Sequence, residues 1–187
     1  MSYQPLSCTI TGVAPLLLHN GQLANPANQF ARRMKSISDK RKKTEQDLME
    51  LARLEWLGSL YLRDRQPCIP GEMIEATITK AAGERRKGTT VSAGLYCPGA
   101  FLIKYDGPRD VEQLWTLEEF REVRIVRIGK NRVVRTRPRF DNWSVEVTVM
   151  HRPDMLSAND VRELIELAGD LKGLGDWRPK YGRFRVD

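Results

Sequence analysis

Residues 143–149 read Trp-Ser-Val-Glu-Val-Thr-Val, with an apolar residue at every second position. Successive side chains of a β-strand point to opposite faces of the sheet, so this period of two predicts a strand with one buried face. The polar residues Ser144, Glu146 and Thr148 would occupy the other face. The stretch therefore predicts a sheet that is covered on one side only.

The residues after this strand predict a helix that provides the cover. Ser157 and Asn159 are favourable N-caps, and apolar residues recur at helical spacing from Val161 to Leu171, where Gly173 ends the pattern. A glycine-rich turn over residues 173–183 then leads into a short final strand at residues 184–186.

A basic hairpin is predicted before the strand. Val123 and Ile125 alternate with arginines, residues 129–131 (Gly-Lys-Asn) carry a turn signal, and the chain returns from Val133. Glu122 is the single acid between residues 121 and 139. The basic residues of this segment are Arg121, Arg124, Arg127, Lys130, Arg132, Arg135, Arg137 and Arg139.

The period-two spacing of Arg135, Arg137 and Arg139 puts these three on one side of the returning strand, where they could follow successive phosphates. Phe140 or Trp143 would offer a stacking surface nearby. The alternative is that the arginines only increase solubility or protect an edge strand.

The N-terminal half predicts one strand and two helices. The strand covers residues 7–13, with residues 16–19 as a continuation. Thr44 and Asp47 form a capping-box pattern for a helix that continues toward Leu60. The second helix starts at Pro70 and Gly71, with an exposed amide end, and closes near residue 83.

The segments between these elements contain turns, basic stretches and one further strand. Residues 20–28 are turn-forming, and the basic residues 32–43 are expected to be exposed and mobile. Residues 84–91 form a basic linker over a ligand groove, residues 95–104 a strand, and the acidic residues up to 119 a loop. The order of elements predicts an α+β fold, an antiparallel sheet with helices on one face.

Composition narrows the choice of partners and location. The chain has 187 residues, enough for one hydrophobic core, and 31 Lys and Arg against 24 Asp and Glu give a net charge of +7. Such a charge attracts phosphate backbones or anionic lipid. Apolar runs are far shorter than the ~20 residues that span a bilayer, and the first residues lack a secretory signal, so we expect no membrane association and a cytoplasmic location.

The three cysteines Cys8, Cys68 and Cys97 lie far apart without a CxxC pair, which predicts reduced, buried thiols and neither disulfides nor zinc. The acids are scattered along helix faces, which predicts no metal site. His19 and His151 lack the partners of a catalytic site, so we expect ordinary histidines, although His19 could act as a general base.

The C-terminal run 173–183 (Gly-Leu-Gly-Asp-Trp-Arg-Pro-Lys-Tyr-Gly-Arg) combines flexible glycines with cations and aromatics. Backbone amides can approach phosphate there, Arg178, Lys180 and Arg183 supply charge, and Trp177 or Tyr181 can stack on a base. The run lacks Gly-Lys-Ser/Thr and follows a helix, so it is not a nucleotide-hydrolysing P-loop. The alternative is a helix C-cap and tight turn with Trp177 in the core.

This run, extended to Phe184, resembles the glycine-rich C-terminal loop of the repeat-associated mysterious proteins, the RAMP superfamily of CRISPR-associated RNA binders. Residues 69–76 (Ile-Pro-Gly-Glu-Met-Ile-Glu-Ala) resemble the Ile-Pro-Gly helix start of the same superfamily. The resemblance implies a ferredoxin-like, RRM-type antiparallel sheet with helices on one face, in a single domain of residues 1–187. Insertions at about residues 20–60 and 84–142 would hold the basic hairpin and loops.

Within the superfamily the backbone subunit that polymerises along guide RNA is the closer likeness, and the length implies a compact or phage-borne form. The resemblance implies single-stranded RNA, further copies of the chain and other effector-complex subunits as partners, with no cofactor. Cleaving backbone subunits use an aspartate after the first strand, which residues 20–23 (Asn-Gly-Gln-Leu) lack, so we expect binding without cleavage.

The expected RNA-binding residues are gathered in loops, helix ends and the hairpin, where they would line one groove. They are His19, Asn20, Arg32, Arg33, Lys35, Arg41, Arg85, Arg86, Lys87, Arg124, Arg127, Lys130, Arg132, Arg135, Arg137, Arg139, Gly173, Gly175, Trp177, Arg178, Lys180, Tyr181 and Arg183.

Two other functions stay open on the sequence. One is a metal-independent RAMP endoribonuclease that processes precursor RNA, with His19 as the base and Tyr181 or a lysine assisting. The other is a viral structural or assembly protein that uses its basic surfaces for packing. The sequence does not discriminate RNA from single-stranded DNA, because stacking and phosphate contacts serve both.

Overall fold

The computed structural model describes residues 2–187, which form two compact units. Unit 1 consists of the residues up to 16, residues 62–106 and residues 141–187, and unit 2 consists of residues 17–61 and 107–140. Unit 2 overlaps with the two insertions predicted at about residues 20–60 and 84–142. That these insertions belong to one RAMP-like domain stays a prediction.

Unit 1 is built on an antiparallel sheet in the order β11-β1-β10-β5. The strands are β1 (Gln4–Gly12), β5 (Leu95–Tyr96), β10 (Trp143–His151) and β11 (Phe184–Val186). β7 (Lys104–Tyr105) also pairs with β10. β1 and β10 pair along almost their whole length, with Cys8 opposite Val147. The α+β class and the long strands predicted from the sequence are confirmed.

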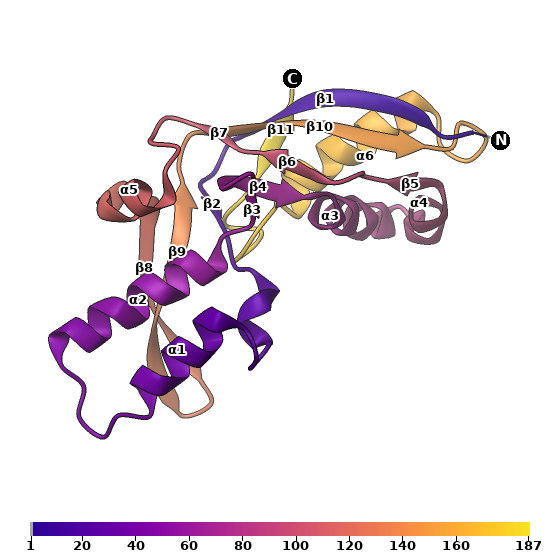
Figure 1. The fold of residues 1–187 in the computed structure, drawn as a ribbon. Coiled ribbons are helices and arrows are strands. Elements are labelled where there is room, and N and C mark those ends of the chain that lie inside the picture. Colours follow the sequence, from indigo (N-terminus) through magenta and orange to yellow (C-terminus); the bar gives the residue numbers. More distant parts are fainter. Residues whose placement is uncertain (1) are drawn as a thin grey trace. The chain divides into compact units, whose positions relative to one another are not determined.

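Two helices cover one face of this sheet, as Figure 1 shows: α3 (Gly71–Glu84) and α6 (Ala158–Leu171). The predicted period of two is present in β10, where Val145, Val147 and Val149 are buried. The other face is polar, and the Ser7 and Thr148 hydroxyls share a hydrogen bond of 3.0 Å across it. Burial of the valines against the helices stabilises this unit through the hydrophobic effect.

The start of α6 agrees with its sequence signal. Ser157 is the N-cap, and it forms a capping box with Asp160. Hydrogen bonds lower the pKa of Asp160 to about 2. The largest effect comes from Ser157 and the next from Lys87. A carboxylate in the first turn also interacts favourably with the helix dipole.

The segment between α3 and the end of β7 differs from its prediction in two places. Residues 84–91, expected as a linker, contain the start of a short helix, α4 (Gly88–Gly94). The single strand expected at residues 95–104 is three short strands, β5, β6 (Ala100–Leu102) and β7. Pro98 has no amide hydrogen to continue a ladder, and Gly99 has a positive φ of 80° that redirects the chain. β6 joins a second small sheet in the order β3-β4-β6, with β3 (Leu62–Arg63) and β4 (Gln66–Pro70).

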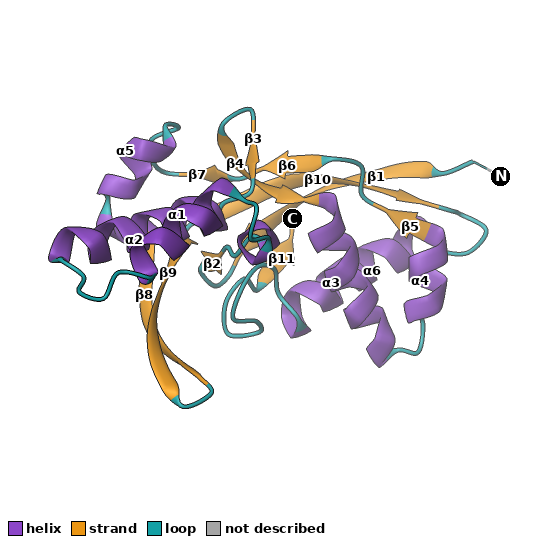
Figure 2. Cartoon of the chain, turned by 60° about the horizontal axis from the view of Figure 1, so that its bottom comes forward, coloured by secondary structure: helices purple, strands orange, loops and turns teal. Residues whose placement is uncertain are grey.

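Unit 2 combines helices with the predicted hairpin (Figure 2). The hairpin strands β8 (Arg121–Ile128) and β9 (Asn131–Phe140) form a sheet in the order β2-β9-β8 with β2 (Leu16–Leu17). The helices are α1 (Gln29–Ser38), α2 (Glu45–Ser59) and α5 (Val111–Thr116), with 3-10 turns η1 (Gly21–Ala24) and η2 (Glu118–Phe120). The hairpin and the Thr44–Asp47 capping box of α2 are confirmed.

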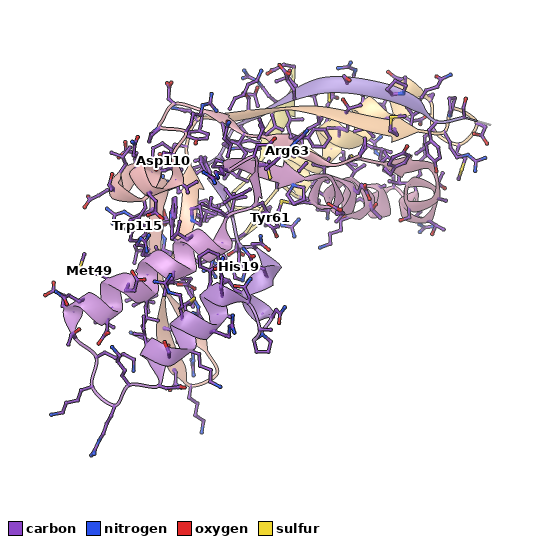
Figure 3. All side chains as sticks on the ribbon, viewed as in Figure 1. His19, Met49, Tyr61, Arg63, Asp110 and Trp115 are labelled. Atoms are coloured by element: carbon purple, nitrogen blue, oxygen red, sulfur yellow. The ribbon has the colours of Figure 1, made fainter. Side chains whose placement is uncertain are left out.

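The core of unit 2 forms around Trp56 of α2. Its indole is fully buried and donates a 2.8 Å hydrogen bond to the carbonyl oxygen of Phe120. Trp115 of α5 lies against it with 5.6 Å between the ring centroids, and Figure 3 shows Trp115 between α5 and α2. Phe140 packs edge-on against Phe120. The buried aromatics thus join both segments of unit 2 into one core.

The basic residues of the stretch 32–43 are exposed as expected, but its first part is a helix, α1, that was not predicted. Asn28 caps the helix by accepting from the N–H of Phe30 at 2.8 Å. Phe30, Met34 and Ile37 recur at helical spacing and are partly buried, whereas the basic residues occupy the remaining positions. In the same way Asp110 caps α5, in a segment that was expected to be a loop.

The thiols provide a simple test of this fold. Burial, reinforced by the negative charge of Glu75, raises the pKa of Cys97 to about 12, and burial raises that of Cys68 to about 11. These raised pKa values keep both thiols protonated at pH 8, and the thiolate is the reactive form. We therefore expect a disulfide-exchange reagent to label Cys68 and Cys97 slowly in the native protein and all three cysteines rapidly in urea. Rapid native labelling of Cys97 would contradict this burial.

None of the helices within residues 2–187 has the length and apolar character needed to cross a bilayer.

Candidate nucleic-acid interface

The net positive charge of the chain resides on unit 2. This unit carries 17 Lys and Arg against ten Asp and Glu, a net charge of +7, whereas unit 1 carries 14 of each. A polyanion is attracted by the charges within a Debye length of about 10 Å. The charge of each unit therefore matters more for binding than the net charge of the whole chain. The predicted insertions overlap with unit 2, but the net charge taken from the composition is that of the whole chain and not of each part.

The exposed side of α1 presents the first group of cations. Arg32, Arg33 and Lys35 are exposed, as is Arg41 in the loop that follows. Arg33 pairs with Glu50 at 2.6 Å and still keeps 60 % of its side chain exposed. These side chains remain hydrated and accessible to a phosphate backbone.

The end of the hairpin presents the second group, which we call the hairpin tip: Arg127, Lys130 and Arg132. Arg127 and Arg132 lie opposite each other in the register, and Arg127 donates to the carbonyl oxygen of Gly129 at 3.0 Å. All three tip residues are exposed. In Figure 2 the hairpin projects from the helices of its unit, so the tip can contact a ligand from several sides.

The base of the hairpin differs from the expected row of phosphate-binding arginines. Arg137 is only 6 % exposed and donates to Glu55 of α2 at 2.8 Å. Arg135 donates to the same carboxylate at 3.2 Å, and the N–H of Thr136 donates to its second oxygen at 2.9 Å. The structure therefore gives Arg137 a structural partner inside unit 2 and leaves Arg135 half-buried.

A second carboxylate holds the remaining arginines of the base. Glu122 is 5 % exposed and accepts from Arg139 at 2.6 Å and from Arg124. Glu122, the single acid between residues 121 and 139, thus lies between Arg124 and Arg139. Buried carboxylates require such partners, because desolvation of an unpaired charge is costly.

The glycine-rich run, residues 173–183, lies in unit 1, and internal hydrogen bonds hold the backbone at both of its ends. The N–H of Leu174 donates to Gly182 and the N–H of Gly182 to Pro15, both at 2.8 Å. A Cβ at Gly182 would overlap with the carbonyl oxygen of Leu174, and φ there is +72°. The glycines at positions 173 and 182 are thus required for close packing of the turn.

The aromatic residues of this run are only partly available. Tyr181 is 8 % exposed and lies 6.1 Å from the ring of Trp177, measured between centroids. Trp177 keeps part of its surface accessible, and Arg178, Lys180 and Arg183 are exposed. The exposed cations are accessible to phosphate, whereas the alternative of a tight turn with Trp177 in the core holds only in part, because Tyr181 is buried and Trp177 is half-buried.

The start of α3 was expected to be an exposed amide end, but its first amide, that of Gly71, is not free. Gly71 is buried, its N–H donates to the carbonyl oxygen of Gly99 at 2.8 Å, and a Cβ there would overlap with the carbonyl oxygen of Cys97. The Pro-Gly pair thus allows two segments of backbone to pack closely.

The other predicted residues lie in loops. The side chain of Asn20 is held by hydrogen bonds within unit 2. It caps η1, and its amide donates to the carbonyl oxygen of Leu60 at 3.0 Å. His19 beside it has an exposed side chain, and its carbonyl oxygen accepts from the Tyr61 hydroxyl at 3.2 Å (Figure 3).

In unit 1, the basic linker lies between two helices. Arg85 pairs with Glu163 at 3.2 Å and Lys87 with Asp160 at 3.0 Å, while Arg86 is exposed. Two of the three cations therefore stabilise the position of α6. Surface pairs of this kind are worth at most about 1 kcal/mol and can exchange with phosphate.

A cavity of unit 2 was not anticipated from the sequence. It has a volume of about 410 Å³ and lies between α1, α2 and β9. Its residues come from three separate segments, so only the Met34 and Ile37 spacing of the missed helix α1 could have pointed to it.

Within residues 2–187, no three His, Cys, Asp or Glu side chains gather where they could hold a metal ion. Comparison with models of protein families and with curated proteins found no match for this chain. The functional assignment therefore depends on the geometry and charge of the two units.

Proposed function

We propose that this protein binds single-stranded RNA without cleaving it, and that unit 2 supplies most of the binding. The observation that carries the proposal is the charge partition, in which unit 2 has the whole net charge of +7 and presents it on α1 and the hairpin tip. Exposed cations on a projecting hairpin can follow a flexible strand better than a rigid duplex.

The proposal includes a relationship to the RAMP superfamily, as a guide-RNA-binding backbone subunit. The strand order β11-β1-β10-β5, with α3 and α6 on one face, is the order expected for a βαββαβ ferredoxin-like core, and this supports the relationship. The glycine-rich run after α6 supports it as well. In this view unit 2 is the insertion that carries the RNA-binding hairpin, and further copies of the chain bind side by side along one strand.

A charge reversal on α1 and the loop that follows it tests the proposal. The triple variant Arg32→Glu, Lys35→Glu and Arg41→Glu replaces three exposed cations of unit 2, and we expect it to weaken binding of a fluorescent single-stranded RNA at least about 30-fold at 0.1 M salt. The measurement is fluorescence anisotropy.

The matched control reverses three exposed cations of unit 1, Arg65, Lys80 and Arg162, and so changes the net charge equally. We expect less than about a threefold loss for this variant, because long-range charge alone is screened. Equal losses for both variants would show that net charge, and not unit 2, determines binding.

A further inference from the structure

The cavity of unit 2 combines an apolar wall with a cationic rim. Met34 of α1, Leu48 and Leu51 of α2 and Val133 of β9 form the wall. Lys43, Arg132 and Arg135 also line the cavity. Its volume of about 410 Å³ falls within the roughly 300–1,000 Å³ of small-molecule sites.

The wall is accessible from solvent. Leu48 and Val134, which both line the cavity, are each 56 % exposed. Apolar side chains that remain open around a concave site lower the cost of desolvating an apolar ligand. The cavity is therefore suited to a compact ligand with apolar surfaces.

The charges around the cavity favour an anion. Three cations line it against one acid, Glu55, and Arg135 and Arg137 already neutralise that carboxylate at 3.2 and 2.8 Å. Arg132 makes no ion pair among the described side chains, and the ammonium of Lys43 donates only to the carbonyl oxygen of Lys40 at 3.0 Å. A phosphate at the rim would provide these donors with a charged acceptor.

We propose that this cavity binds one nucleotide unit, with the base against the apolar wall and the phosphate at Lys43 and Arg132. A nucleotide combines the two required features, a flat ring with apolar faces and an adjacent negative charge. Bases leave their stack to enter such sites when a single strand is bound, and arginine planes or aliphatic side chains can cover their faces. The inference rests on the proposed function for its RNA source, and the same chemistry would also accept a free mononucleotide.

The test uses an adjacent pair of residues on α2. Leu48 lines the cavity, whereas Met49 does not and is 64 % exposed. Figure 3 shows Met49 on the side of α2 that faces away from α1. Leu48→Glu and Met49→Glu therefore introduce the same charge one residue apart, at positions where a polar side chain leaves the fold intact.

The probes are a short single-stranded RNA that contains 2-aminopurine and the free 2-aminopurine ribonucleoside monophosphate. We expect the 2-aminopurine fluorescence to change on binding, and Leu48→Glu to weaken this site about tenfold or more while Met49→Glu leaves it within about twofold. A signal from the RNA probe identifies a strand as the source, and a signal from the free nucleotide identifies a mononucleotide; either supports the site.

The inference is overturned if both variants behave as the wild type or if neither probe responds. The fluorescence anisotropy of an end-labelled RNA measures total RNA binding, and so distinguishes failure of the cavity site from failure of the proposed function. If the wild type binds RNA but Leu48→Glu has no effect, the cavity is not a nucleotide site. If RNA does not bind at all, the proposed function fails, and the free nucleotide still tests the cavity by itself.

Discussion

Glu55→Ala is expected to lower the free energy of unfolding by about 3–5 kcal/mol. The carboxylate is 6 % exposed and accepts hydrogen bonds from Arg135, Arg137 and the N–H of Thr136. Its removal leaves the Arg137 guanidinium, itself 6 % exposed, without this partner inside unit 2. Removing one partner from a buried network is costly because the desolvated guanidinium and the N–H of Thr136 both lose this acceptor.

The measurement is urea unfolding followed by tryptophan fluorescence, to which Trp56 and Trp115 contribute from unit 2. Glu50→Ala is the matched control, because Glu50 lies on the same helix and pairs with Arg33 and Arg53 at the surface. We expect a loss of at most about 1 kcal/mol for the control, and less at high salt. Glu55→Gln, which can still accept from Thr136, should fall between the two. Equal effects of Glu55→Ala and Glu50→Ala would contradict the buried network.

Gly182→Ala is expected to destabilise unit 1 by about 3 kcal/mol or more. The added Cβ would overlap with the backbone of Leu174, and the positive φ of 72° is unfavourable for alanine. The neighbouring backbone cannot move away without losing the hydrogen bonds from Leu174 to Gly182 and from Gly182 to Pro15.

The control is Gly83→Ala in α3, where an added Cβ meets no atom within 4 Å. This change should leave stability unaltered or raise it by up to about 1 kcal/mol, because alanine favours the helix. Thermal unfolding by circular dichroism compares the two variants. If Gly182→Ala unfolds at the wild-type temperature, the turn is not as closely packed as described.

The sequence best predicted those elements whose residue pattern depends on neighbours close in sequence. The alternation in β10 and the capped apolar repeat of α6 each indicate directly which side chains are buried. Both predictions are confirmed. Helix α1 was missed because arginine and lysine between Phe30, Met34 and Ile37 made the segment resemble a solvated linker.

The candidate site was harder to predict because partners far apart in sequence decide which side chains are exposed. The period of two correctly put Arg135, Arg137 and Arg139 on one side of β9, but Glu55, more than eighty residues earlier than Arg137, makes part of that side an interior. The glycine-rich run and the Pro-Gly helix start likewise read as open amides, whereas Gly182 and Gly71 are buried against backbone that no local pattern reveals.

The salt dependence of RNA binding by the wild-type protein tests the central claim most directly. If α1 and the hairpin tip contact four or more phosphates, the logarithm of the binding constant should fall with the logarithm of the salt concentration with a slope of about −3 or steeper, since each contact on a single strand contributes about −0.7. Anisotropy titrations between 50 mM and 300 mM NaCl measure the slope. A slope near zero, or no binding at 50 mM NaCl, would contradict the proposal that the charge of unit 2 binds single-stranded RNA.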